Sequence, residues 1–185
     1  MDNSPPQRFR VVELSQPGRT LAIEDNQKGG HAMCWRCDHP DKTLDDYLSL
    51  LREKILARGW TVQYVEDDRR PFAYTIGLHD RGLPEFLVTG LSPRQSLWLL
   101  DTFVKRALIG RRFAAGDRLP LPAGTRLEVV KVAQPDAHMG MAIAIEGPDV
   151  QALQLVWADD HGRWPWGKDF DDGHRTQPVL GARAA

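Results

Sequence analysis

The residues best suited to metal or thiol chemistry are Cys34 and Cys37, which are separated by two residues. Two thiolates at this spacing can hold one zinc ion from a single tight turn. The side chains that could complete a zinc site are Asp38, His39, His79 and His161. A helix is predicted to begin shortly afterwards, and its positive end could instead stabilise a thiolate for redox chemistry, although the charge of Asp38 opposes this. A third interpretation is structural, since free cysteines often lie buried and fix a loop to the core.

His79 and Glu85 are the candidate catalytic residues. His79 lies in a polar turn beside Asp80, and Glu85 follows Pro84 at the start of an apolar run. A histidine and a carboxylate are the minimum for general acid–base catalysis, because imidazole titrates near neutral pH. Alternatively, His79 is solvated, and Glu85 accepts hydrogen bonds from backbone N–H groups or pairs with an arginine.

A second polar cluster, DDHGRWPWG at residues 159–167, combines aromatic and charged side chains. Aromatic planes beside convergent polar groups are typical of ligand pockets and of hot spots for protein partners. The predicted ligand-binding residues are Asp159, Arg163, Trp164 and Trp166 of this cluster, with Tyr74 and Thr75 of a nearby strand. Successive strand residues point to opposite faces, so only one of Tyr74 and Thr75 can face a given pocket. The alternative is a Trp-Pro-Trp clasp that closes the core over a sheet edge.

Two apolar runs are expected to position these side chains. Residues 72–77 and 86–89 are rich in aromatic and β-branched residues, and the turn sequence HDRG lies between them, which predicts two neighbouring strands. Both runs are almost continuously apolar, which is typical of strands covered on both faces. We therefore expect this pair to form the centre of the molecule.

The flanking segments predict the rest of the fold. Thr43 with Asp46 and Ser92 with Gln95 have the spacing of capping boxes, so a long helix is expected after each. The further elements expected are strands at residues 60–66, 126–132 and 153–158, a loop at 111–124 and a short helix at 136–146. The order predicts an α+β fold, a mostly antiparallel β-sheet with two long helices packed on it and a short third helix.

Length and composition set the domain organisation. A chain of 185 residues is long enough for one domain with a real core. We expect an accessory segment at residues 1–31, with a disordered arm and a hairpin, a single α+β domain at 32–170 and a disordered tail at 171–185. The chain has 42% hydrophobic residues, and 24 basic against 25 acidic residues. This balance is that of a globular protein and argues against a nucleic-acid partner.

No apolar run approaches the roughly 20 residues of a membrane span, so no membrane partner is expected. The first residues lack the apolar core of a signal peptide, so a cytoplasmic location is predicted.

Four sequence motifs make the chain resemble a known protein family. The segments CWRCDHP, AYTIGL, LPEFLVTGL and LQLVWADDHGRWPW are similar to those of a bacterial domain of unknown function, number 4262. The resemblance covers residues 34–166, and it implies no activity. The recurring positions of the family match here at Cys34, Cys37, Asp38, Tyr74, Thr75, Gly77, Pro84, Glu85, Gly90, Gln154, Trp157, Asp159, Gly162, Pro165 and Trp166. Ala158 departs from a proline that the family often has there.

These observations predict a protein that binds a small ligand, a metal or a partner protein. The binding site is expected where the CxxCD loop, the central strand pair and the DxHGRxPW turn meet. One competing hypothesis is a metal- or thiol-dependent enzyme that uses Cys34, Cys37, His79 and Glu85, with zinc as the metal that the cysteines favour. Another is an interaction or immunity-type protein without pocket chemistry.

Overall fold

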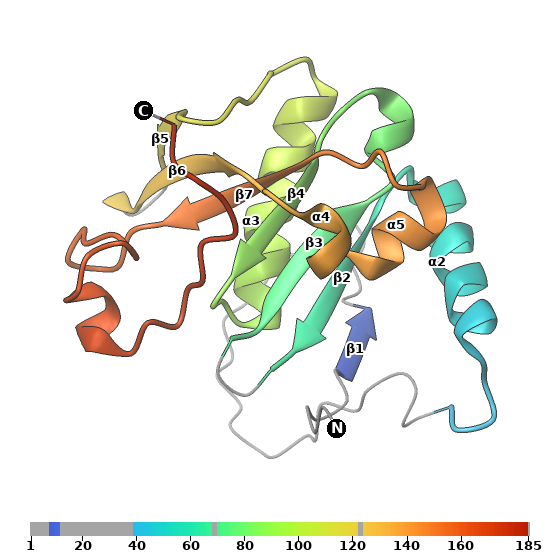
Figure 1. Cartoon of the computed structure of the whole chain (residues 1–185). Helices are drawn as coiled ribbons and strands as arrows, with labels where there is room; N and C mark the ends of the chain where they lie inside the picture. The colour runs from blue at the N-terminus through green and yellow to red at the C-terminus, as the bar shows by residue number, and fades with distance from the viewer. Residues whose placement is uncertain (1–7, 12–38, 68–69, 122–123, 185) are drawn as a thin grey trace, which may run out of the picture.

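The computed structural model describes residues 8–11, 39–67, 70–121 and 124–184. In this part of the chain, seven strands form one mixed sheet with helices on both faces (Figure 1). The strands are β1 (Arg8–Val11), β2 (Thr61–Glu66), β3 (Phe72–Ile76), β4 (Glu85–Thr89), β5 (Arg118–Pro120), β6 (Arg126–Lys131) and β7 (Ala152–Trp157). The helices are α2 (Leu44–Arg58), α3 (Pro93–Leu108), α4 (Pro135–His138), α5 (Gly140–Glu146) and the short 3₁₀ helices η1 (His79–Arg81) and η3 (Phe170–Gly173). The predicted α+β class is confirmed.

Strands β3 and β4 occupy the middle of the sheet, whose order is β1-β2-β3-β4-β7-β6-β5. They pair antiparallel, with Tyr74 opposite Leu87. Every residue of β4 is buried, and so is β3 from Ala73 onward. The prediction of a central pair covered on both faces is therefore confirmed.

Strands β4 and β7 are the one parallel pair among the described strands, with Phe86 beside Leu153. The other neighbouring strands run antiparallel. Because β4 and β7 run in the same direction, their carboxyl ends lie side by side at the same end of the sheet. Two loops that are far apart in the sequence therefore meet there.

The two faces of the sheet carry different helices, as Figure 1 shows. Helix α3 covers one face, where Phe103 and Val104 pack on Phe86 and Val88 of β4. Helices α2 and α5 cover the other face, which includes Leu87. Alternate residues of β4 thus point into different apolar clusters, which explains why the strand carries no solvated polar face.

Capping residues set the ends of the long helices as predicted. The Thr43 side chain accepts a hydrogen bond from the Asp46 backbone, and the Asp46 carboxylate accepts one from the Thr43 N–H. Ser92 and Gln95 form the same box at the start of α3. Gly59 ends α2 with φ +84°, a left-handed conformation that favours glycine.

The segment predicted as a loop at residues 111–124 contains the edge strand β5. Leu119 pairs with Leu127, and Arg118 binds the Glu128 carboxylate on β6. The strand has three residues and pairs with residues at most ten positions away, but the prolines and glycines of the segment indicate a loop and do not reveal it. The helix predicted at residues 136–146 is present as two short helices, α4 and α5.

The predicted disordered tail is a structured segment over residues 171–184. The Leu180 N–H donates to Gln154 Oε1 at 2.7 Å, and Gln154 Nε2 donates to the Pro178 carbonyl at 2.7 Å. Arg183 forms an ion pair with the buried Glu128. These bonds satisfy polar groups of β6 and β7 on the face that carries α2 and α5, and a buried polar group left without a partner would be costly. The tail therefore completes the cover of that face (Figure 1).

The proposed accessory segment falls mostly outside the described residues. Strand β1 lies within it and pairs with β2, while residues 1–7 and 12–38 are not described. The division into an accessory segment and one domain stays a prediction.

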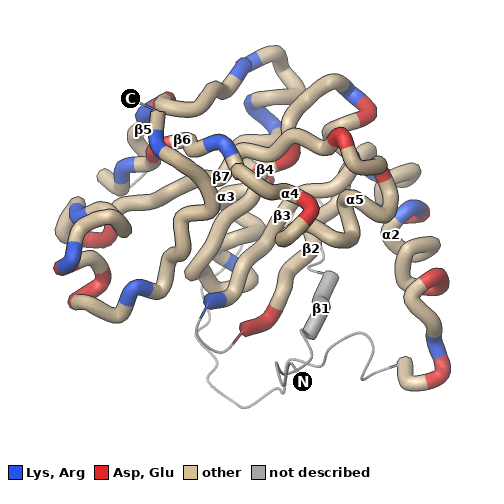
Figure 2. Tube along the Cα trace, in the orientation of Figure 1, with Lys and Arg blue, Asp and Glu red and all other residues tan. Residues whose placement is uncertain are grey.

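Acidic and basic residues are interspersed along the chain trace, and the central strands carry few of them (Figure 2). None of the helices in the described residues combines the length and the apolar character that a membrane span requires.

Candidate functional site

A crevice of about 450 Å³ opens where the parallel strands β4 and β7 end. The residues that line it are Gly90, Leu91, Gln95, Trp98, Leu99, Leu121, Thr125, Trp157, Ala158, Asp159, Asp160, Asp171 and Thr176. They come from the β4–α3 connection, α3, the end of β7 and the loop that follows it. Ligands of α/β sheets often bind outside the carboxyl ends of strands, where connections leave toward different sides. We call this site the β4–β7 crevice.

Two tryptophans form aromatic walls of the crevice. Trp157 is held in place because its Nε1 donates to the Thr89 carbonyl at 3.0 Å and its backbone N–H donates to Gln177 Oε1 at 2.9 Å. Its ring also packs on Phe170, with ring centroids 5.3 Å apart. Trp98 on α3 is 49% exposed, which is unusual for so large an apolar side chain. One wall is therefore rigid, and the other is open to solvent.

Asp159 organises the loop after β7. Its carboxylate accepts hydrogen bonds from the backbone N–H groups of His161, Arg163 and Asp171 at 2.8–3.0 Å. It also forms an ion pair with the Arg163 guanidinium at 2.7 Å, and its side chain is 8% exposed. Desolvation raises the pKa of Asp159, but these hydrogen bonds and Arg163 outweigh it and lower the pKa to about 2.

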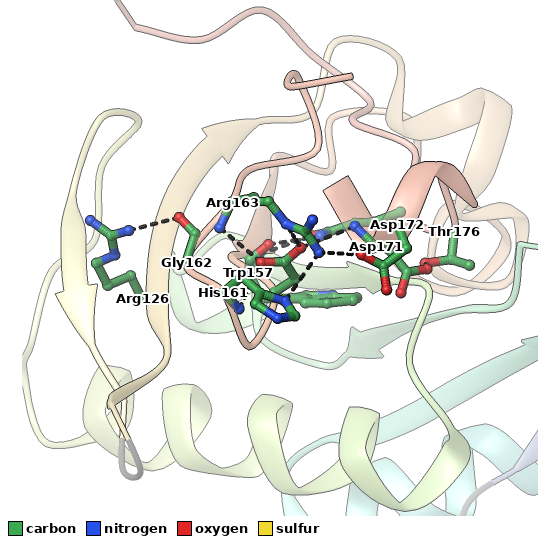
Figure 3. Close-up of polar contacts among 10 residues, drawn as sticks. Arg126, Trp157, His161, Gly162, Arg163, Asp171, Asp172 and Thr176 are labelled. Carbon is green, nitrogen blue, oxygen red and sulfur yellow. Dashed lines mark hydrogen bonds and ion pairs between the residues drawn. The ribbon is translucent and has the colours of Figure 1, made fainter. Parts of the chain in front are cut away.

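Arg163 connects the two halves of this loop. Its Nη2 pairs with Asp172 at 2.8 Å and lies 3.1 Å from His161 Nδ1, as Figure 3 shows. Thr176 donates to the Asp171 carboxylate at 2.7 Å, which fixes the chain where it leaves the loop. The loop is thus rigid around a charged pair.

Trp164 and Trp166 lie outside the lining of the crevice. Their rings stack with centroids 4.9 Å apart and an interplanar angle of 10°. Arg126 lies over Trp164, and Arg183 lies over Trp166 with its Cζ 3.9 Å from the ring centroid. The two stacked rings thus lie between two guanidinium groups, and the four side chains join the post-β7 loop to β6 and to the C-terminal segment.

A second polar group lies at the opposite end of the sheet. Glu85 is fully buried, and its Oε1 accepts hydrogen bonds from the backbone N–H groups of Gly77, Leu78 and His79. Its other oxygen, Oε2, accepts a hydrogen bond from the Thr75 hydroxyl. Glu85 therefore anchors the turn between β3 and β4.

Glu146 at the end of α5 joins this group. The Gly77 N–H donates to Glu146 Oε1 at 2.9 Å as well as to Glu85 Oε1 at 3.1 Å, so the two carboxyl groups are neighbours. Desolvation and the nearby Glu146 charge raise the pKa of Glu85 to about 8. Desolvation also raises the pKa of Glu146.

The structure separates residues that the sequence placed in one site. Asp159 lies at the carboxyl ends of β4 and β7, whereas Thr75, His79 and Glu85 lie at the other end of the same strands, roughly 16 Å away for a five-residue strand. Tyr74 is buried against α5, where its hydroxyl accepts the Met141 N–H. The expectation that the unusual side chains gather at one edge of the central pair is therefore wrong, because they divide between its two ends.

The predicted metal ligands fall largely outside the described part of the chain. Cys34, Cys37 and Asp38 are not described, and His39 is exposed. Within the described residues, no group of three His, Cys, Asp or Glu side chains is arranged to hold a metal ion.

Sequence reasoning missed several residues of both sites. Trp98 and Asp171 line the crevice, and Glu146 joins Glu85. Trp98 could have been found from the sequence, because it is a large apolar residue that lies outside the buried face of its helix. No local signal identifies Glu146, since it meets Gly77 across 69 residues of sequence.

One family model matches the chain, over residues 54–171, and its description is "Domain of unknown function (DUF4262)". The matched region includes the central strands and the loop after β7, and Cys34 and Cys37 precede it. Neither a curated protein nor a solved structure matches the chain.

Proposed function

Since the chain belongs to the family described as domain of unknown function DUF4262, whose description names no activity, we propose a function from the geometry of its crevice: the chain binds a small organic cation there. The observation that carries the proposal is the composition of the crevice. Two tryptophans and three carboxylates line it, and no Lys, Arg or His is among the described residues that do so.

The location of the crevice supports binding. It lies at the carboxyl ends of the parallel pair, beside the start of a 16-residue helix. The wall formed by Trp157 and Asp159 is rigid, because each of these residues is held by several hydrogen bonds. A site whose walls are fixed in advance loses little entropy when a ligand binds.

The charge of the lining favours a cation. Asp159 is neutralised by Arg163, but Asp160 is exposed and forms no ion pair in the part of the chain described. Asp171 has one carboxylate oxygen bound to Thr176, which leaves the other for a ligand. An anion would meet these carboxylates, and the start of α3 offers it little because Ser92 and Gln95 already cap that helix.

The size of the crevice favours an organic ion over a bare metal ion. Within the described residues, the carboxylates do not converge as metal ligands do. A ligand with an ammonium or guanidinium group and an apolar part would contact both the carboxylates and the tryptophan rings of the lining. The apolar part would pack on Trp98 and Trp157, and a cation over an indole face adds a favourable cation–π contact. A cytoplasmic location remains part of the proposal.

The hypothesis of a metal- or thiol-dependent enzyme has less support. Its histidine and glutamate lie at the opposite end of the sheet from the crevice, and Glu85 is fully buried. The hypothesis of an interaction protein relies on Trp164 and Trp166, whose stacked rings already contact Arg126 and Arg183.

The proposal is tested with three probes of similar size and different charge: benzylammonium, benzyl alcohol and benzoate. Binding is followed at pH 7 by the NMR signals of the tryptophan indole N–H groups. We expect benzylammonium to shift the signals of Trp98 and Trp157. Trp98→Ala and Asp160→Asn should each weaken this binding about two- to fivefold, as expected for a partly exposed cation–π contact or ion pair.

Two control variants lie outside the crevice. Trp166→Ala removes a tryptophan of similar exposure, 40%, and Asp149→Asn removes one exposed carboxylate. Both should leave the affinity for benzylammonium unchanged. If the neutral or anionic probe shifts the same signals and the cation does not, the crevice binds ligands of another class; if no probe shifts them, the proposed binding function is wrong.

A further inference from the structure

The carboxyl groups of Glu85 and Glu146 meet at one backbone N–H. Gly77 N lies 3.1 Å from Glu85 Oε1 and 2.9 Å from Glu146 Oε1. Gly77 has φ +114°, and a Cβ there would lie 2.9 Å from the Gly59 carbonyl oxygen, so glycine is required for this approach. The turn between β3 and β4 and the end of α5 are therefore joined through one glycine.

The donors available at this junction do not suffice for two ionised carboxylates. Glu85 is surrounded by three backbone N–H groups and the Thr75 hydroxyl. Glu146 receives the Gly77 N–H on one oxygen, and its Oε2 is buried without a hydrogen-bond partner in the described residues. A buried anionic oxygen without a donor is costly, and two adjacent carboxylates repel each other.

One proton resolves both problems. The two carboxyl groups share the Gly77 N–H as a donor and are therefore neighbours, and a hydrogen bond between them requires a proton on one of them. The resulting O–H···O bond removes one negative charge and gives the pair the donor that it lacks. We propose that Glu85 and Glu146 form a proton-binding site, in which one shared proton attaches the end of helix α5 to the turn between β3 and β4.

The surroundings of the pair are compatible with this role. The charged residues that act on Glu146 besides Glu85 are His79 and Asp80 of η1, which have opposite effects on its pKa. Arg81, the remaining charged residue of η1, lies instead over Gly59 at the end of α2. Helix α2 packs toward α5 with the apolar or aromatic residues Tyr47, Leu48 and Leu51. Strand β3 contributes the neutral Thr75 and the buried Tyr74 hydroxyl, whose pKa burial raises.

Loss of the shared proton has a structural consequence. Once both carboxyl groups are ionised, repulsion acts between α5 and the β3–β4 turn. Glu85 is held by four donors and Glu146 by one, so Glu146 should move away and carry the end of α5 with it. Raising the pH is therefore expected to loosen α5 while β4 stays in place.

The experiment is a carboxyl ¹³C NMR titration of the full chain between pH 4 and pH 10, with backbone amide exchange measured on the same samples. We expect one glutamate to titrate near pH 8, far above an ordinary glutamate. Over the same range, the amides of α5 should lose protection relative to those of α3. In Glu146→Gln, the titration near pH 8 should shift toward acid pH and the protection of α5 should no longer depend on pH. Glu53→Gln, which removes an exposed carboxylate of α2, should change neither result.

Two results would overturn the proposal. Titration of both glutamates between pH 4 and pH 5 would exclude a shared proton at neutral pH. A glutamate that titrates near pH 8 while α5 keeps the same protection as α3 would exclude the coupling to the helix. Both readouts come from the unmodified chain, so they do not depend on whether the variant folds.

Discussion

At the scale of single residues, two buried or nearly buried carboxylates behave in opposite ways. Asp159 receives three backbone N–H groups and a guanidinium, so its charged form is favoured. Glu85 also receives three backbone N–H groups, but full burial and the adjacent Glu146 favour its protonated form. The number of donors alone therefore does not decide the charge state, since the neighbouring charge and the desolvation decide it as well.

Asp159 should be required for the stability of the loop after β7. Asp159→Asn replaces an acceptor of four hydrogen bonds and leaves Arg163 without its partly buried partner, so we expect the free energy of unfolding to fall by about 2 kcal/mol. Asp160→Asn, at an exposed carboxylate one residue away, should change it little. Urea denaturation of the three proteins at pH 7 measures the difference, and equal stability of Asp159→Asn and the unmodified chain would contradict the assigned role.

Because of Asp159, we also expect the free energy of unfolding to fall at acid pH. The pKa of Asp159 is about 2 in the folded chain and about 3.8 when unfolded, so its contribution is present above pH 3.8 and is lost as the pH falls toward 2. In Asp159→Asn this loss should be absent. Denaturation midpoints of both proteins are measured at intervals between pH 5 and pH 2. The midpoint of the unmodified chain should fall more steeply with decreasing pH than that of Asp159→Asn.

Because of Glu85, we expect the free energy of unfolding to fall, and not to rise, as the pH increases above 4.5. Its pKa is about 8 in the folded chain against 4.5 for an ordinary glutamate, so the folded chain holds a proton that the unfolded chain has released. Stability is therefore greatest below pH 4.5 with respect to this group and falls as the pH rises to 8, by up to about 1.4 kcal/mol per pH unit. The free energy of unfolding of Glu146→Gln should fall less steeply over this interval, and an unchanged slope would contradict the coupling.

At the scale of elements, the C-terminal segment acts as part of the core. It provides the backbone groups that satisfy the buried Gln154 amide, and Arg183 pairs with the buried Glu128. Arg183 also lowers the pKa of Glu128 through its hydrogen bond. A segment with few apolar residues can thus be ordered by the polar groups that it satisfies.

Removal of this segment gives a direct test. In a chain that ends at Gly173, Gln154 Oε1 loses the Leu180 N–H and Glu128 Oε1 loses Arg183, although Gln154 keeps Thr89 and Glu128 keeps Arg118. A buried polar atom left without its partner costs about 1–3 kcal/mol, so the melting temperature should fall by several degrees. A chain that lacks only Ala184 and Ala185 should melt like the full chain. A shortened chain that melts at the same temperature would show that the segment contributes nothing to the core.

At the scale of the whole molecule, groups of polar side chains lie at the two ends of the central strands. The parallel pairing of β4 with β7 brings the β4–α3 connection and the post-β7 loop together at one end and forms the crevice. At the other end, the β3–β4 turn meets α5 through Gly77. Ligand binding and proton binding are therefore proposed for sites at opposite ends of the same central strands.

The sequence by itself determined the elements whose signals are local. Capping boxes at Thr43 and Ser92 identified both long helices, and the continuous apolar composition of β3 and β4 identified the buried centre. The polar residues worth attention, Glu85 and Asp159, could also be selected, because a carboxylate beside an apolar strand needs a partner. These signals depend on neighbours within a few positions, so they are readable without knowledge of the fold.

Tertiary structure decided which of these elements and residues meet. The parallel register of β4 and β7, the hydrogen bonds of the C-terminal segment and the contact between Gly77 and Glu146 all join positions that are distant in sequence. Each forms only when the chain has collapsed, and the same local sequence is compatible with other pairings. The assignment of Glu85 and Asp159 to opposite ends of the sheet therefore required the strand directions, which no local pattern encodes.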